Sequence, residues 1–89
     1  MNVNYSPWFL GIAKKANLRI RKHLEKRIEI FSKDPKNPQL NNHSLKGKYQ
    51  GYRSIDITSD WRAIYQEVKI NEKIIAYFIA MGTHKQLYG

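Results

Sequence analysis

The stretch Gly51–Tyr65, GYRSIDITSDWRAIY, decides the fold of this chain. Two runs of β-branched and aromatic residues, which are typical of strands, flank residues 58–60. Those three residues, Thr-Ser-Asp, favour a turn because their short polar side chains can hydrogen-bond their own backbone. The stretch therefore predicts a β-hairpin, which we expect to be the central strand pair of the sheet.

Successive side chains of a strand point to opposite faces of its sheet. In the first strand of the hairpin, Ser54, Asp56 and Thr58 should therefore share one face, opposite Arg53 and Ile55. We expect one face of the hairpin to be polar, which makes it a candidate working surface.

Composition limits the class of protein. The chain has 89 residues, 42% of them hydrophobic, so it can form one small domain, residues 1–89. It has no cysteine, which excludes a disulfide framework and a thiolate metal site. Its apolar runs fall short of the ~20 residues that a membrane span needs, and its first residues lack the pattern of a signal peptide. We expect a cytoplasmic protein with no membrane partner.

The charge of the chain points to an anionic partner. Sixteen lysines and arginines against seven aspartates and glutamates give a net charge of +9. A field of this sign favours nucleic acid, ribosomal RNA or an acidic protein. A generic basic protein with no such partner would show the same balance, so the charge alone leaves both interpretations open.

A short strand and a helix are expected at the start of the chain. Residues 3–5 can form the strand, and Ser6-Pro7 combines a capping side chain with a proline suited to the first helical turn. The helix should end near Ala16. Its apolar face should consist of Trp8, Phe9, Ile12 and Ala13.

A second helix should follow Asn17 and end near residue 31 or 32, before two prolines. One apolar stripe has the spacing of a helix: Ile20, Leu24, Ile28 and Phe31. The other faces carry Arg19, Arg21, Lys22, Lys26 and Arg27. These basic side chains indicate either a nucleic-acid surface or an ordinary solvated helix face.

After the hairpin, a turn at residues 71–73 should lead into a last strand, Ile74–Met81, which is apolar enough to be covered on both faces. The expected fold class is α+β, in the order β-α-α-β-β-β. Both helices should pack on one face of a small, mainly antiparallel sheet.

Polar residues that could carry chemistry lie at strand ends and in loops. They are His43, Arg53, Asp56, Asp60, Arg62, His84 and Tyr88. Together they suit cleavage of RNA without a metal, which needs a base, an acid and cations around the phosphate. Histidine suits the first two roles, since its pKa of about 6.5 lies near neutral pH. Arginine suits the third, because it can bind phosphate with two hydrogen bonds.

Four motifs resemble the RelE/ParE superfamily of bacterial toxins, and most of all its YafQ-like branch. They are His43-Ser-Leu-Lys-Gly47, Gly51-Tyr-Arg53, Asp60-Trp-Arg62-Ala-Ile-Tyr65 and Gly82-Thr-His84 followed by Leu87-Tyr88-Gly89. The resemblance covers nearly the whole chain. It implies a RelE-like fold, a cognate acidic antitoxin and cleavage of mRNA on the ribosome, which would arrest translation. It implies no cofactor, and contact with operator DNA only through the antitoxin.

The resemblance also implies residue roles. His84 is expected to be the general acid, Asp60 or His43 the base or the group that orients it, and Arg62 the cation that stabilises the phosphorane. Asp56 stands where the YafQ-like branch has another active-site histidine; it could orient a histidine or accept a proton, but it repels phosphate. The expected substrate-binding residues are Arg53, Tyr88, Lys46 and Lys48.

Two other functions are compatible with the same fold. A ParE-like toxin that poisons DNA gyrase would not need either histidine as acid or base. A non-catalytic RNA-binding protein would cause neither growth arrest nor new mRNA ends.

Overall fold

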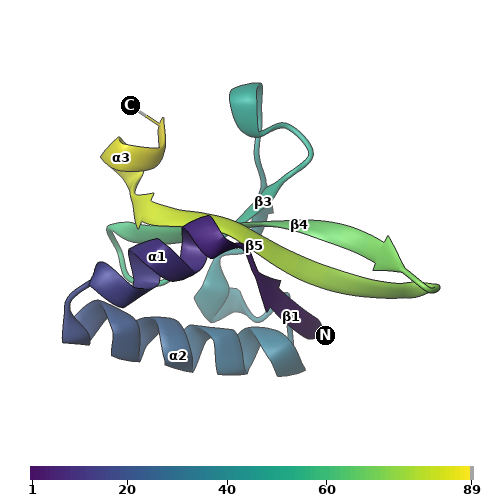
Figure 1. Cartoon of the computed structure of the whole chain (residues 1–89), viewed down its shortest axis with the longest axis horizontal. Coiled ribbons are helices and arrows are strands. Elements are labelled where there is room, and N and C mark those ends of the chain that lie inside the picture. The colour runs from purple at the N-terminus through teal and green to yellow at the C-terminus, as the bar shows by residue number, and fades with distance from the viewer. Residues whose placement is uncertain (89) are drawn as a thin grey trace.

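The computed structural model describes residues 1–88 and contains a five-stranded sheet with two long helices on one face (Figure 1). The strands are β1 (Asn2–Tyr5), β2 (His43–Ser44), β3 (Arg53–Asp56), β4 (Trp61–Ile70) and β5 (Lys73–Thr83). The α-helices are α1 (Pro7–Lys15), α2 (Leu18–Lys33) and α3 (His84–Tyr88). Two short 3₁₀ helices, η1 (Pro38–Leu40) and η2 (Gly47–Tyr49), lie in the connection between α2 and β3.

The sheet has the order β1-β5-β4-β3-β2, in which β1 runs parallel to β5 and the other neighbours are antiparallel. The predicted hairpin is confirmed as β3–β4, and the hydroxyl of Thr58 accepts hydrogen bonds from the N–H groups of Asp60 and Trp61 in its turn. β4 is the central strand. The two-residue strand β2, which was not predicted, pairs with β3 at the edge.

Both predicted helix starts are confirmed. The Ser6 hydroxyl accepts a hydrogen bond from the Phe9 N–H at 3.0 Å, and the Asn17 side chain does the same for the Ile20 N–H. The predicted apolar face of α1 is wrong in one member, because Trp8 is 70% exposed. Trp8 lies in the first turn of α1, beyond the buried stripe that begins at Phe9.

The main core lies between the two long helices and the sheet, and aromatic rings fill its centre. Phe31 of α2 contacts Tyr65 of β4 edge to face, with ring centroids 4.9 Å apart, and Phe78 of β5 at 5.3 Å. The predicted stripe of α2 is confirmed, since its residues either are buried there or pack against the core. Each such aromatic pair adds about 0.5–1.5 kcal/mol beyond the burial of its area.

The opposite face of the sheet carries a smaller apolar cluster around Ile64, Ala80 and Leu87. Side chains of the 45–52 loop and the C-terminal helix α3 cover it, and Figure 1 shows α3 on the side of the sheet away from α1 and α2. The hairpin face that was expected to be polar carries Ser54, Asp56 and Arg62, but it also carries Ile64 of this cluster, and Ser54 is fully buried there.

The expectation that the last strand is covered on both faces is also wrong at the start of the strand. The long β4–β5 hairpin extends away from the helices (Figure 1), and Ile74 is 54% exposed. Among residues 1–88, every helix is too short or too polar to cross a bilayer.

Candidate active site

Strand register brings three chemical groups to the face of the sheet opposite α1 and α2. His43 of β2 pairs with Ser54, and Asp56 of β3 pairs with Arg62 of β4. Paired residues of neighbouring strands share a face, so these side chains lie on the face that carries the smaller apolar cluster. His43 of the edge strand β2 is thus in the set of paired residues next to the one that contains Arg62 of the central strand, on the same face.

The C-terminal helix α3 adds a second histidine, and a reciprocal cap fixes its start. The Gln86 side chain accepts from the Thr83 N–H at 2.9 Å, and the Thr83 hydroxyl accepts from the Gln86 N–H at 3.1 Å. This is a capping box, with Thr and Gln three positions apart. The N–H of His84 also donates to the Asp60 carbonyl oxygen at 3.1 Å, which ties the first residue of α3 to the β3–β4 turn.

Gly82 allows α3 to fold back closely on the sheet. A Cβ atom at this position would lie 3.0 Å from Oε1 of Gln86, closer than side chains normally approach. The glycine therefore leaves space for the cap that sets the position of His84.

These elements surround a hollow of about 390 Å³ that is open to solvent. Its lining consists of Asn41, His43, Leu45, Lys46, Arg62, His84 and Tyr88. The two histidines are 41 positions apart in the sequence, at residues 43 and 84. The hollow thus combines two imidazoles, two cations and an aromatic ring, a set that could bind a phosphate group and transfer protons on either side of it.

The hydrogen bond made by His43 decides which of its ring nitrogens is free. Nδ1 lies 2.8 Å from the carbonyl oxygen of Asn41, which can only accept. Nδ1 must therefore carry the proton, and in the neutral ring Nε2 keeps its lone pair. This is the form of imidazole that can remove a proton from a substrate.

Arg62 is held in place by the strand and the turn that flank it. Its Nε lies 3.0 Å from Oδ1 of Asp56, and its Nη1 donates to the carbonyl oxygen of Ser59 at 2.8 Å. The side chains of Arg62 and Asp56 are only 19% and 22% exposed, so this ion pair is partly shielded from water. Asp56 thus orients the arginine, and its own charge is balanced by the guanidinium.

Tyr88 connects His84 to the 45–52 loop. Its ring centroid lies 4.7 Å from that of His84 and 5.9 Å from that of Tyr49, which it meets edge to face. Tyr49 in turn contacts Tyr52 at 6.3 Å. The histidine ring is therefore packed at the end of an aromatic column that begins in the loop.

The hollow brings together five of the nine predicted site residues, His43, Lys46, Arg62, His84 and Tyr88, and Asp56 contacts it through Arg62. The side chains of Asp60 and Lys48 are outside the lining, and the ammonium group of Lys48 lies over the Tyr49 ring, 5.1 Å from its centroid. Arg53 is on the helix-covered face of the sheet, where its Nε donates to Asn42 at 2.8 Å. The predicted roles of all nine residues remain predictions.

Sequence reasoning missed several residues that shape the site. The capping box of Thr83 and Gln86 was visible as T-x-x-Q, whereas the contributions of Asn41, Leu45 and Tyr49 depend on how the loop folds and had no local signal.

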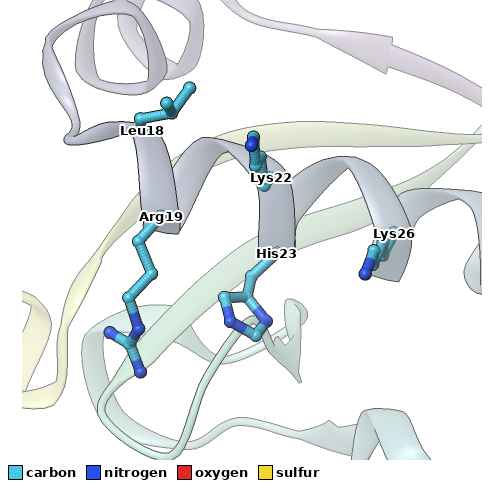
Figure 2. Close-up of a pocket in the computed structure, with 5 residues that line it drawn as sticks. All are labelled: Leu18, Arg19, Lys22, His23 and Lys26. Carbon is cyan, nitrogen blue, oxygen red and sulfur yellow. The ribbon is translucent and has the colours of Figure 1, made fainter.

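A second hollow, of about 380 Å³, lies along α2 (Figure 2). Its lining is Leu18, Arg19, Lys22, His23 and Lys26. It offers positive charge and one imidazole but no second acid or base, so it suits anion binding rather than catalysis. Within residues 1–88, no three histidine, aspartate or glutamate side chains are placed to hold a metal ion.

Comparison with known proteins identifies the family of the chain. Residues 10–89 match the family model described as the bacterial toxin of type II toxin–antitoxin systems, YafQ. No curated protein sequence matches the chain.

The similarity to solved structures extends over nearly the whole chain. The chain is similar to YafQ from Escherichia coli BL21(DE3), with 25% identity, a TM-score of 0.78 and coverage of 99% of this chain and 98% of that one. It is also similar to the toxin in the E. coli DinJ–YafQ toxin–antitoxin complex, with 27% identity, a TM-score of 0.65 and coverage of 99% and 97%.

A YoeB/ParE toxin from Agrobacterium tumefaciens, at 18% identity, a TM-score of 0.75 and coverage of 94% and 99%, shares the fold. The chain therefore belongs to the YafQ family of toxins of bacterial type II toxin–antitoxin systems.

Proposed function

We propose that this toxin is a ribosome-dependent endoribonuclease that cleaves mRNA by acid–base catalysis without a metal ion. The toxins of its family are ribonucleases. The observation that carries the proposal is the shared hollow, which His43, from the middle of the chain, and His84, from its end, line together with Arg62.

The two histidines divide the proton transfers. Nε2 of His43 removes the proton of a ribose 2′-hydroxyl, whose oxygen attacks the adjacent phosphorus. His84 in its protonated form gives a proton to the 5′-oxygen as the bond from phosphorus to that oxygen breaks. Each positioned acid or base contributes on the order of 10²–10⁴ in rate. We give the base role to His43 rather than to Asp60, because the Asp60 side chain is outside the lining of the hollow.

The cations and the aromatic ring bind the substrate. Arg62, oriented by Asp56, stabilises the negative charge that grows on the phosphorane oxygens. Lys46 binds the backbone of the RNA next to the cleaved phosphate. Tyr88 stacks on an unpaired base, an interaction worth about 1–3 kcal/mol.

The openness of the site explains why the ribosome would be required. His43 and His84 are both exposed, and the hollow that they line is open to solvent, so it leaves a flexible RNA strand free to move. Orienting the reacting groups contributes several kcal/mol in such reactions. On the ribosome, the mRNA is already held in place, and the net charge of +9 favours association with ribosomal RNA.

We also propose a cognate antitoxin with an acidic segment that folds on binding. The positive charge of the toxin favours such a segment, and its similarity to the toxin of the DinJ–YafQ complex supports the existence of a partner. Exposed apolar side chains on α1, Trp8 and Leu10, could anchor a helix of that partner.

Inducing the toxin in cells and mapping the 5′ ends of mRNA tests the proposal. The wild-type protein should produce cuts in a fixed position relative to the reading frame, and His84→Ala should abolish them. Lys85→Ala, which changes the neighbouring exposed residue of α3, is the matched control and should cleave like the wild type. DNA damage without new mRNA ends would instead indicate a gyrase poison, and neither effect would indicate a non-catalytic protein.

A further inference from the structure

A network of three side chains lies on the helix-covered face, directly behind β2. Nδ2 of Asn42 donates to the carbonyl oxygen of Pro35 and to the hydroxyl of Tyr65, each at 2.8 Å. Nε of Arg53 donates to Oδ1 of Asn42, also at 2.8 Å. The catalytic scheme above uses none of these residues.

The amide of Asn42 can take only one orientation in this network. The Pro35 carbonyl is only an acceptor, so it must face the amide nitrogen, and the Arg53 guanidinium is only a donor, so it must face the amide oxygen. Both protons of the amide nitrogen and its oxygen therefore have partners. Removing either partner leaves a partly buried polar group unsatisfied.

The network compensates for the weakness of β2. This edge strand has two residues, His43 and Ser44, that pair with β3, and one more backbone hydrogen bond follows, from the Leu45 N–H to the Tyr52 carbonyl oxygen at 3.0 Å. So short a pairing holds a candidate catalytic base only weakly. Asn42 directly precedes His43, and successive side chains point to opposite faces. An amide anchored behind the sheet thus turns the imidazole toward the hollow in front of it.

The residue before Asn42 completes the arrangement. Asn41 adopts a left-handed backbone conformation, with φ of 48°, and its carbonyl oxygen lies 2.8 Å from Nδ1 of His43. Fixing Asn42 on one side therefore also fixes the carbonyl that selects the tautomer of His43.

We propose that Asn42, held by Arg53 and Tyr65, is a positioning residue that orients His43 through the sheet. The catalytic importance of this role rests on the proposed function, but the orientation itself does not. Arg53 thereby acts on the chemistry from behind the sheet, without touching the substrate.

Long-range ¹H–¹⁵N NMR spectra of the histidine rings test the orientation in the free toxin. At mildly alkaline pH, where imidazoles are neutral, His43 of the wild type should show a single state with the proton on Nδ1. Asn42→Ala and Arg53→Met should turn this state into a mixture of both tautomers, and Arg53→Lys, which restores a donor, should recover part of it. Arg21→Met removes a positive charge from the exposed surface of α2 and should leave His43 unchanged.

The other histidines decide whether the effect is local. His23 and His84 lie on α2 and α3, so their signals should stay in place in every variant. A His43 that keeps one tautomer in Asn42→Ala and Arg53→Met would overturn the proposal. Equal disturbance of all three histidines would also overturn it, since the network would then be a general support of the fold.

Single-turnover cleavage on ribosomes tests the consequence. Asn42→Ala should lower the maximal rate about 10- to 100-fold, the loss expected from a misplaced reacting group, and should leave the half-saturating ribosome concentration unchanged. Weaker ribosome binding with an unchanged maximal rate would contradict a positioning role. If His43→Ala cleaves like the wild type, the proposed function of His43 fails, while the NMR result still decides whether Asn42 orients it.

Discussion

The two faces of the sheet differ in how they are closed. The helix-covered face is sealed by α1 and α2 around the aromatic rings of Phe9, Phe31, Tyr65 and Phe78. The other face has three buried apolar residues, one of them Leu87 of the five-residue helix α3, and beside them an open polar hollow. The first face supplies most of the stability, whereas the second presents the candidate catalytic groups. The toxin can therefore expose two histidines beside a partly buried arginine without weakening its core.

The largest expected effect comes from emptying the sealed face. Phe31→Ala removes a ring that contacts both Tyr65 and Phe78 and should lower the free energy of unfolding by about 3–5 kcal/mol. Urea denaturation followed by circular dichroism would measure it. Phe31→Leu, which keeps most of the volume, should lose much less, and equal losses in the two variants would argue against a tightly packed core.

A similar truncation on the other face should cost less stability and more activity. Leu87→Ala should lower the free energy of unfolding by about 2 kcal/mol, the low end for leucine, because its cluster is small and Leu87 belongs to a short helix. Since α3 carries His84, ribosomal cleavage should fall by more than the folded fraction does. A loss of stability as large as that of Phe31→Ala would erase the difference between the faces.

The cap of α3 gives a smaller effect on the same face. The Cβ of Gly82→Ala would displace the Gln86 side chain, which at present accepts from the Thr83 N–H. Loss of one cap costs about 0.5–2 kcal/mol, which thermal denaturation can detect. Gly11→Ala, at a helical position with open space around it, is the control and should not be destabilised.

The smallest effect concerns alkaline pH and the sealed face. Burial raises the pKa of Tyr5 above its ordinary value of 10. Below pH 10 both states hold the proton and stability is complete; as the pH rises, the unfolded state loses the proton first, so stability falls until the raised pKa of the folded state is passed. Tyr5→Phe should therefore lose less stability than the wild type as the pH rises above about 10. If the free energy of unfolding, measured with urea, falls with pH equally in the two proteins, the result would contradict the burial effect.

Local chemistry explains which parts of the fold were predictable. Ser6, Asn17 and Thr58 cap or turn the chain through contacts within three residues, so the sequence shows their effect directly. The strand β2 has no such signal, because two residues form it and distant side chains hold it in place. Trp8 was assigned to the core because periodicity identifies a stripe but not the turn at which burial begins.

The candidate site was predictable mainly through the resemblance of its motifs. No local rule brings His43 and His84 together; strand register and the fold of α3 do so. Arg53 was assigned to the substrate, although alternation along its strand already placed it opposite Asp56. Its position on the helix-covered face follows from that alternation, and its predicted contact with the substrate stays a prediction.

Replacing the bridging 5′-oxygen of the scissile phosphate with sulfur tests the central claim most directly. A thiolate leaves without needing a proton, so an mRNA with this single change removes the need for an acid but not for a base. The account predicts that, on ribosomes, the sulfur substrate restores rapid cleavage to His84→Ala and leaves His43→Ala slow. A His84→Ala toxin that stays equally slow on both substrates, or a His43→Ala toxin rescued by sulfur, would contradict the assignment of acid and base to these two histidines.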